Sequence, residues 1–180
     1  MASGYSTQNQ LLLNKLLKFY NKDNNLSKIL HIINGESKVS LRLIDWFTTN
    51  YAKKNFIVYS IDNRRFKVYV DYKLKLKAYS KRRFDPFCRW ERINIPYNDE
   101  CLIQTTIGQL NFFKWALENK ILNYIEKNYE KIEADMNQRN STARHKIVEK
   151  NKTRKKRQEL SVSATKSIKK EKVEIVVKFN

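Results

Sequence analysis

The chain has 180 residues, and its 41% hydrophobic and 12% aromatic side chains exclude an intrinsically disordered protein, because a hydrophobic core can form. Its 3 glycines and 2 prolines are too few for a turn-rich β-sandwich or barrel. The formal net charge of +19 favours a polyanionic partner, and we expect no membrane association because no apolar run approaches the roughly 20 residues of a membrane span.

The first third of the chain predicts three helices. Residues 8–20 carry leucines and a tyrosine at helical spacing, with lysines on the other side. A shorter apolar stretch, residues 29–33, predicts a second helix that ends at Asn34 and Gly35, a pair typical of helix C-termini. Ser40 has the position of an N-cap for a third helix that reaches about Lys54.

β-Branched and aromatic residues next predict a β-hairpin. Its strands are expected at residues 56–60 and 66–72, with Asp62 and Asn63 between them. The number of residues between the strands leaves the turn type open.

The segment after the hairpin is ambiguous. In residues 73–83, apolar and lysine side chains alternate as in an edge strand, yet Tyr72, Leu76 and Tyr79 share one helical face, and we favour the helix. The pair Asp85-Pro86 ends this element. Residues 90–95 then predict a strand.

The clearest helical pattern covers residues 106–129. Thr106 and Gln109 form a capping-box sequence, and apolar side chains follow at intervals of three and four residues. The aromatic stripe of this helix favours core packing over a cofactor site. A more acidic helix, residues 130–138, is expected to continue it or to follow it.

The C-terminal part has a different character. Residues 139–157 predict either a solvated basic helix or a segment that is disordered until bound. Residues 173–179 have a strong strand pattern, and residues 160–164 a weaker one. These two could pair as a hairpin around residues 166–172, or add to the sheet that begins at Phe56.

Together these elements predict an α+β protein. A helix-rich compact domain with a short antiparallel β-hairpin is expected at residues 8–138, after a flexible N-terminus at residues 1–7. A basic C-terminal extension, residues 139–180, ends in the strand-forming segment.

The chemistry of a catalytic or metal centre is not apparent in the sequence. His31 lies among isoleucines and favours a structural role, and His145 lies in the basic tail. Cys88 and Cys101 form no metal-binding pair, and we expect two free, partly buried thiols. The carboxylates of Glu126, Glu130 and Glu133 have the spacing of a solvated helix face. We therefore predict a non-enzymatic protein with no metal, no cofactor and no small-molecule substrate.

The positive charge is concentrated in two blocks. Residues 64–92 carry 11 basic and 3 acidic side chains, and residues 139–172 carry 13 and 3. Such clusters bind phosphate backbones by releasing counterions, without choosing a base sequence. We select as nucleic-acid-binding candidates the following basic residues: Arg64, Arg65, Lys81, Arg82, Arg83, Arg89, Arg92, Arg154, Lys155, Lys156 and Arg157.

Two alternatives apply to these candidates. The aromatic residues among the first block could stack on unpaired bases, but we favour core packing for them. The cations around Arg82 could form salt bridges with the acids of residues 118–135, but we favour anion binding. The tail cluster at 154–157 is also compatible with a nuclear import signal or an acidic protein partner.

Three stretches carry a family resemblance. They are SLRLIDWFTTNY at 40–51, LKAYSKRRFDPFCR at 76–89 and TTIGQLNFFKWA at 105–116. This pattern resembles a group of small basic proteins encoded by large nucleocytoplasmic DNA viruses of algae and protists. The resemblance transfers no catalytic residue. It implies a virion or a viral factory in the host cytoplasm, with the nucleus also possible, where a basic protein meets viral DNA, RNA or capsid surfaces.

The leading hypothesis is therefore non-enzymatic, largely sequence-independent nucleic-acid binding, in genome condensation or packaging or in a viral factory. Residues 64–92 would contact phosphates, and residues 139–172 would wrap around the nucleic acid and add affinity. The alternative is a virion structural or interaction protein whose basic tail and terminal strand dock on capsid or core partners. A third possibility is a component of viral transcription or translation that binds RNA.

Overall fold

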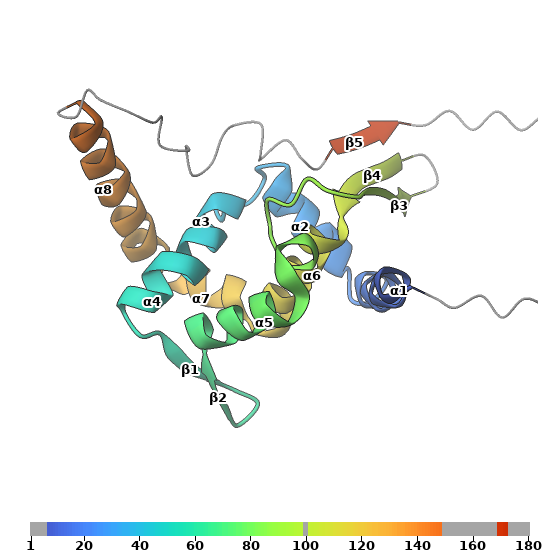
Figure 1. Ribbon diagram of the computed structural model, residues 1–180, viewed down its shortest axis with the longest axis horizontal. Helices are drawn as coiled ribbons and strands as arrows, with labels where there is room; N and C mark the ends of the chain where they lie inside the picture. The colour runs from blue at the N-terminus through green and yellow to red at the C-terminus, as the bar shows by residue number, and fades with distance from the viewer. Residues whose placement is uncertain (1–6, 99–100, 149–168, 173–180) are drawn as a thin grey trace, which may run out of the picture.

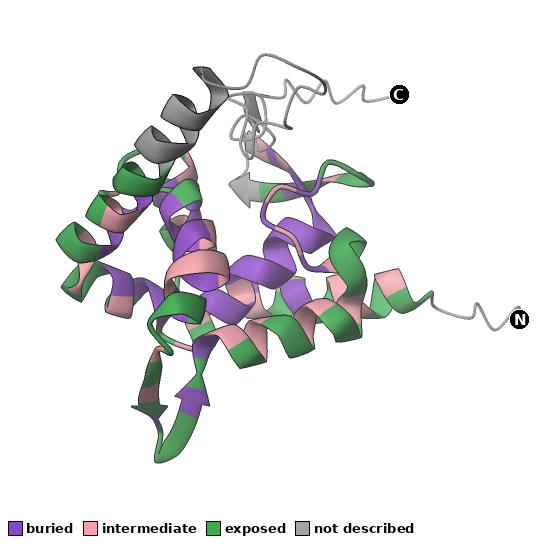
Figure 2. Cartoon of the chain, turned by 60° about the vertical axis from the view of Figure 1, so that its left-hand side comes forward, coloured by how far each residue is buried: buried purple, intermediate pink, exposed green. Residues whose placement is uncertain are grey.

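An almost fully buried helix, α6 (Ile107–Glu118), lies at the centre of the molecule. The computed structural model describes residues 7–98, 101–148 and 169–172. Helices α1 (Gln8–Tyr20), α5 (Val68–Arg83) and α7 (Ile121–Lys127) pack against α6. Figure 2 shows the buried residues gathered along the central elements, whereas the outer sides of the surrounding helices are exposed.

The predicted α+β class is confirmed, with helices around the core and strands at its periphery. Strands β1 (Val58–Ile61) and β2 (Arg64–Lys67) form one antiparallel pair. A second antiparallel sheet has the order β3-β4-β5, formed by β3 (Arg92–Asn98), β4 (Cys101–Thr106) and β5 (Lys169–Lys172). The two sheets lie at opposite ends of the molecule (Figure 1).

The N-terminal helices form where local signals place them. The hydroxyl of Thr7 caps α1, and α2 (Asn25–Ile33) ends at Asn34, after which Gly35 has a φ of 77°. The Ser40 hydroxyl accepts a hydrogen bond from the Leu43 amide at 3.2 Å and so begins the third helix, as predicted.

The third predicted helix contains one irregularity. It consists of α3 (Leu41–Trp46), a π-helical turn η1 (Phe47–Tyr51) and α4 (Ala52–Lys54), and it ends at Lys54 as predicted. In the wider turn, the hydroxyl of Thr49 donates a hydrogen bond to the Asp45 carbonyl at 2.7 Å. The wider turn holds more residues than an α-helical turn, so the side chains that follow it face the core from different positions around the helix axis.

The hairpin is confirmed, but its second strand is shorter than expected. Asp62 and Asn63 form a two-residue turn with φ angles of 46° and 63°, the left-handed geometry that a type I′ hairpin requires. The prediction of a strand over residues 66–72 is wrong beyond Lys67, because α5 begins at Val68. The cause is tertiary packing, since one face of α5 lies on the core and outweighs the β-propensity of its first residues.

The helical alternative for residues 73–83 is confirmed, with a break near its end. Ser80 has φ 62° and ψ 167°, which interrupts the helical geometry of α5. β3 then runs through Pro96 instead of ending before it. Because β3 is an edge strand, the missing amide hydrogen of proline can be accommodated there.

The single helix predicted over residues 106–129 is two helices. Asn119 and Lys120 separate α6 from α7, and Lys120 has a left-handed φ of 52°. The Asn119 carbonyl accepts a hydrogen bond from the Tyr59 hydroxyl at 2.8 Å, which fixes the break against the β1-β2 hairpin. The apolar periodicity continued across the break because both helices face the same core.

The acidic helix follows α7 as a separate element and is longer than predicted. It is α8 (Tyr129–Val148), so the first part of the basic extension is helical. Its buried residues Ile132 and Met136 pack on the core. Within the parts of the chain that the structure describes, no helix has the length and apolar character that crossing a bilayer requires.

The described strand of the C-terminal extension lies at residues for which no strand was predicted. β5 lies within residues 166–172, where a turn was expected, and it pairs with β4, with Lys169 opposite Gln104 and Lys172 opposite Cys101. It therefore adds to the β3-β4 sheet and not to the sheet that begins near Phe56. β4 itself was not predicted. Residues 160–164 and 173–179 lie outside the described residues.

Candidate nucleic-acid interface

Residues 81–92 comprise the end of α5 after its break at Ser80, the loop that follows, and the first residue of β3. We call this segment the basic loop. It is held by polar side chains that come from the end of β4 and the start of α6. A buried polar side chain costs free energy unless it is hydrogen-bonded. These side chains are 0–6% exposed: Thr105, Thr106, Gln109 and Asn111.

Three of these side chains donate hydrogen bonds to backbone carbonyls of the basic loop. They therefore fix the part of the loop from Arg83 to Cys88. The bonds are Asn111 Nδ2 to the Arg83 carbonyl at 2.8 Å, Gln109 Nε2 to the Pro86 carbonyl at 3.0 Å, and Thr106 Oγ1 to the Cys88 carbonyl at 3.4 Å. We call this set the polar clamp. Thr105 supports it by donating to Gln109 Oε1 at 3.2 Å.

Gly108 allows the loop to approach α6 closely. A Cβ atom at this position would lie 2.9 Å from the Arg82 carbonyl oxygen and 3.0 Å from Cys88 Cβ. The Asp85 amide also donates to the Gly108 carbonyl at 3.3 Å. Only a residue without a side chain lets the two backbones meet at these distances.

Asp85 organises the turn inside the loop. Its carboxylate accepts a hydrogen bond from the Phe87 amide at 2.8 Å, and its carbonyl accepts from the Cys88 amide at 3.2 Å. Burial raises the pKa of Asp85, while the Phe87 hydrogen bond and the positive charge of Lys81 act in the opposite direction. The buried thiol of Cys88 is free, as predicted, and lies 3.5 Å from the Arg82 carbonyl; the Cys101 side chain lies outside the described part.

Most aromatic residues of the first basic block belong to the core, as we favoured. Phe66 and Phe84 are buried, and the rings of Tyr72 and Tyr79 pack on Phe84 with centroid distances of 6.0 and 6.2 Å. Burial is the main cause that raises the pKa of Tyr72 to about 12. Trp90 is the exception, with 71% of its surface exposed.

The clamp brings five predicted cations together on one loop. Lys81, Arg82, Arg89 and Arg92 are exposed, and Arg83 is half-buried. Two of the five donate to neutral amides, Arg83 to Gln8 Oε1 at 3.0 Å and Arg92 to Gln104 Oε1 at 2.8 Å.

For Lys81 and Arg82, the salt-bridged alternative is not what the described residues show. The acids of residues 118–135 that form ion pairs there contact other partners: Glu118 contacts Lys114, and Asp135 contacts Lys54 and Arg139. No ion pair to a carboxylate is found for Lys81 or Arg82 among the described residues.

The remaining candidates lie elsewhere. Arg64 and Arg65 are exposed on β2, at the opposite end of α5 from the basic loop, and a helix of this length spans roughly 20 Å. The exposed Lys73 and Lys77 lie between them on α5. The tail cluster of residues 154–157 lies outside the described residues.

Asp135 on α8 shows the opposite arrangement of charge. Its carboxylate accepts hydrogen bonds from Lys54 Nζ at 3.0 Å and from the indole nitrogen of Trp46 at 3.1 Å, and Arg139 lies 4.0 Å away. Partial burial acts to raise the pKa of Asp135, but the hydrogen bonds from Lys54 and Trp46 and the charges of Lys54 and Arg139 outweigh it. The net result is a pKa below the ordinary value.

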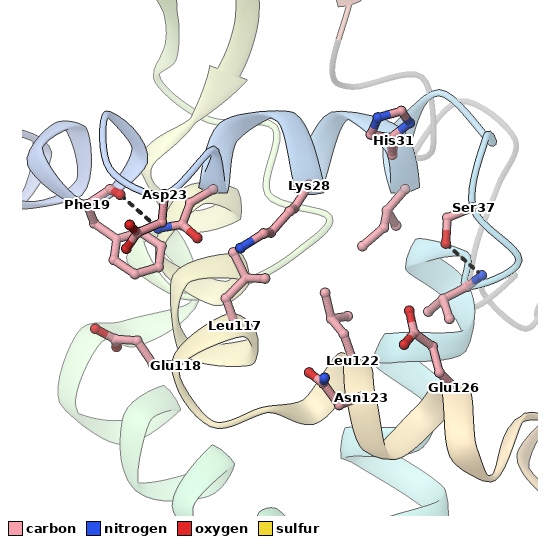
Figure 3. Close-up of a pocket in the computed structure, with 13 residues that line it drawn as sticks. Phe19, Asp23, Lys28, His31, Ser37, Leu117, Glu118, Leu122, Asn123 and Glu126 are labelled. Carbon is pink, nitrogen blue, oxygen red and sulfur yellow. Dashed lines mark hydrogen bonds between the residues drawn. The ribbon is translucent and has the colours of Figure 1, made fainter.

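A cleft of about 540 Å³ lies between α2 and the α6-α7 pair, and its lining has mixed charge (Figure 3). Glu126, which belongs to the predicted solvated row, lines it together with Glu118, Lys28 and His31. His31 is not enclosed by its apolar neighbours: it is exposed, and its Nδ1 contacts the Glu36 carboxylate. The described residues contain no group of three or more His, Cys, Asp or Glu side chains suited to a metal ion.

Sequence reasoning missed the polar clamp. The signal was present, because Gln109 and Asn111 interrupt a helix that is otherwise apolar on nearly every side. Thr106 and Gln109 were interpreted as a helix cap, and the Gln109 amide does donate to Thr106 Oγ1 at 3.2 Å. The partners of the clamp on the basic loop could not be inferred from local spacing.

Comparisons with known proteins support the viral resemblance. "Uncharacterized protein L507" of Acanthamoeba polyphaga mimivirus is 44% identical over 135 residues, which cover 69% of this chain and 52% of that protein. The chain thus spans about half the length of the curated relative it matches. No solved structure matches the chain. The expected resemblance to proteins of large DNA viruses is confirmed. Since residues 2–178 match its family model, the chain belongs to the family described as "Family of unknown function (DUF7197)".

Proposed function

We propose that this protein binds nucleic acid through the phosphate backbone, largely independently of sequence and without enzymatic activity, in the virion or viral factory of a large DNA virus. The observation that carries the proposal is the basic loop, where four of five cations are exposed on a backbone that buried side chains hold in place. Condensation or packaging of the genome is the role that fits this chemistry.

The clamp favours binding because it fixes the loop before a ligand arrives. Ordering a mobile loop on binding costs free energy, and a pre-organised loop avoids part of that cost. Lys81 and Arg82 can then contact phosphates without first losing a carboxylate partner. Each contact releases condensed counterions, which makes the affinity strongly dependent on salt.

The predicted lack of sequence preference follows from the kind of group presented. Lysine and arginine contacts to phosphates position a protein on nucleic acid but do not distinguish base pairs. Residues 139–172 add a net charge of +10 from the sequence, and α8 extends into this block. This part of the chain would increase affinity in the same salt-dependent manner.

The test is fluorescence anisotropy of labelled single-stranded and duplex 20-mers, bound by the full chain over a salt series. We expect Lys81→Gln with Arg82→Gln to lower affinity about tenfold at low salt and to reduce the salt slope by about 2. The matched control is Lys15→Gln with Lys18→Gln, which removes two exposed lysines from α1 and should change affinity less than about twofold. Absence of binding at low salt, or equal losses in both double variants, would contradict the proposal.

A second candidate function is a virion structural or interaction protein, and the outer face of α5 favours it. Val70 and Leu74 are 51% and 59% exposed there, beside Lys73 and Lys77. Exposed apolar residues among cations suit a protein surface that is itself acidic. In this case the protein would remain with the capsid fraction when disrupted virions are treated with nuclease, whereas a genome-bound protein would be released.

A further inference from the structure

We infer that Trp90 is a stacking platform for an unpaired base, so that the basic loop binds single-stranded nucleic acid in preference to duplex. This inference rests on the proposed function and adds the class of ligand. It also assigns an aromatic contact to a surface that otherwise offers phosphate contacts alone.

Trp90 differs from the other two tryptophans of the chain. Trp46 and Trp115 are 9% and 3% exposed, and their indole nitrogens donate to Asp135 and Asp71 at 3.1 and 2.6 Å. Trp90 is 71% exposed, and among the described residues neither an aromatic ring nor a cation packs on its ring. A large apolar ring left in water provides binding free energy to any partner that covers it.

The exposed position of Trp90 is imposed by its neighbours. On one side, the Cys88 carbonyl accepts the hydrogen bond from Thr106. On the other, Glu91 has a left-handed φ of 53°, and its carboxylate accepts a hydrogen bond from Asn9 Nδ2 on α1 at 3.0 Å. The indole is therefore attached to a fixed backbone, and covering it requires little ordering of the chain.

The surroundings of Trp90 favour a nucleic acid over a protein partner. Its sequence neighbours include Arg89 and Arg92. The Cys88 thiol contacts the backbone carbonyls of both Arg82 and Trp90, at 3.5 and 3.9 Å, so that the backbone of Arg82 lies near that of Trp90. Protein interfaces are enriched in tryptophan and arginine but depleted of lysine, and the exposed Lys81 lies on the same loop. Cations beside a free aromatic face are instead typical of single-strand binding, where phosphates follow the cations and bases stack on the ring.

The same geometry disfavours duplex as the main ligand. In a duplex the bases stack on each other and present only their edges, whereas an unpaired base can place its whole face on an indole. A duplex could therefore use the cations of the loop but not Trp90. The preference for single strands should disappear when either the ring or the bases are removed.

The test uses three labelled probes: an oligo-dT 12-mer, an abasic 12-mer with the same number of phosphates, and a 12-base-pair duplex, which has about twice as many. The variants are Trp90→Ala and Trp90→Phe in the full chain. For wild type, we expect oligo-dT to bind about five- to a hundred-fold more tightly than the abasic strand. Trp90→Ala should lose this advantage without changing the abasic or duplex affinities or the salt slope, and Trp90→Phe should retain most of it.

A second readout is the intrinsic tryptophan emission. Because Trp46 and Trp115 are buried, oligo-dT should quench the emission of wild type strongly and that of Trp90→Ala weakly. Thermal melting shows whether Trp90→Ala remains folded, as expected for an exposed side chain.

The other possible outcomes contradict either the stacking role of Trp90 alone, or both this role and the proposed nucleic-acid binding. If wild type binds oligo-dT and the abasic strand equally, Trp90 does not stack on bases, and phosphate binding still stands. If Trp90→Ala weakens all three probes equally, the residue supports the loop instead of a base. If wild type binds no probe at low salt, the proposed function fails as well, and Trp90 becomes a candidate contact for a protein partner.

Discussion

The basic loop and the surface around Asp135 on α8 both contain several charged side chains, but they use them in opposite ways. Around Asp135, opposite charges and the Trp46 indole satisfy one another within the chain. In the basic loop, buried polar groups hold the backbone, and the cations are left at the surface. The comparison teaches that a count of charges does not identify a binding surface, whereas the partners of those charges do.

The two regions also differ in what holds them together. The Asp135 contacts are made by long, partly exposed side chains, and exposed ion pairs contribute little to stability. The polar clamp consists of buried hydrogen bonds whose loss leaves unsatisfied groups in the core. Substitutions at the clamp should therefore change both folding and binding, and substitutions around Asp135 should change stability alone.

The largest loss of stability is expected for Gly108→Ala, because it changes the close contact between α6 and the basic loop. The added Cβ would meet the Arg82 carbonyl at 2.9 Å, and this backbone atom cannot move without displacing the basic loop. We expect a loss of about 2–3 kcal/mol in the free energy of unfolding, with a fall of roughly 5–10 °C in melting temperature, and weaker nucleic-acid binding. Calorimetry and anisotropy measure the two effects.

Gly35→Ala is the matched control for this prediction. Gly35 has a φ of 77°, but nothing lies within 4 Å of a Cβ there. It should cost about 1 kcal/mol through backbone strain alone and leave binding unchanged. Equal effects of the two alanines on binding would show that the approach of the loop to α6 is not specific.

The next largest loss of stability is expected for Asn111→Ala. Removal of the buried Asn111 side chain leaves the Arg83 carbonyl without its 2.8 Å hydrogen bond and should cost about 1–3 kcal/mol. Asn123→Ala, at an exposed position on α7, should stay within about 0.5 kcal/mol of wild type. Denaturant unfolding measures both. If Asn111→Ala were neutral, the clamp would not be what holds the basic loop.

A smaller effect is expected for Asp135→Asn, and it should depend on pH. Because the folded-state pKa of Asp135 lies below its ordinary value of 3.8, the charged carboxylate stabilises the fold above that value. This contribution is lost as pH falls through the lowered pKa. The variant should be about 1 kcal/mol less stable at pH 7 and equal to wild type in strong acid, with unchanged nucleic-acid binding. A pH series of thermal melts measures the difference.

The smallest change in stability is expected for Asp85→Asn, and this variant should be more stable than wild type, whereas the preceding variants are less stable. Burial raises the pKa of Asp85, so ionisation of this group destabilises the fold as pH rises from 3.8 through the raised value. An asparagine can still accept the Phe87 hydrogen bond without carrying the charge. The variant should melt slightly higher than wild type at pH 7 and equally in strong acid.

Asp85→Asn and Asp135→Asn should also differ in their effect on nucleic-acid binding. Asp85→Asn removes one of the two acids of the basic loop and should increase nucleic-acid affinity slightly, whereas Asp135→Asn should not. A lower melting temperature at pH 7 would show that the charge of Asp85 is needed for the turn.

The sequence by itself determined the local features of this protein. The Ser40 cap, the end of α2 at Asn34 and the Asp62-Asn63 turn depend on residues within about four positions of each other, and all were predicted correctly. The two blocks of charge were equally visible, because composition does not depend on folding. The α+β class followed from these elements.

Only the tertiary structure decided how the basic loop is built. The three clamp bonds join residues that are 18, 23 and 28 positions apart, and no local spacing encodes such a pairing. The early start of α5 at Val68 and the break at Lys120 have the same origin, since contacts with distant parts of the core outweighed local propensity. The sequence thus located the cations, and long-range hydrogen bonding fixed the backbone of the loop that carries five of them.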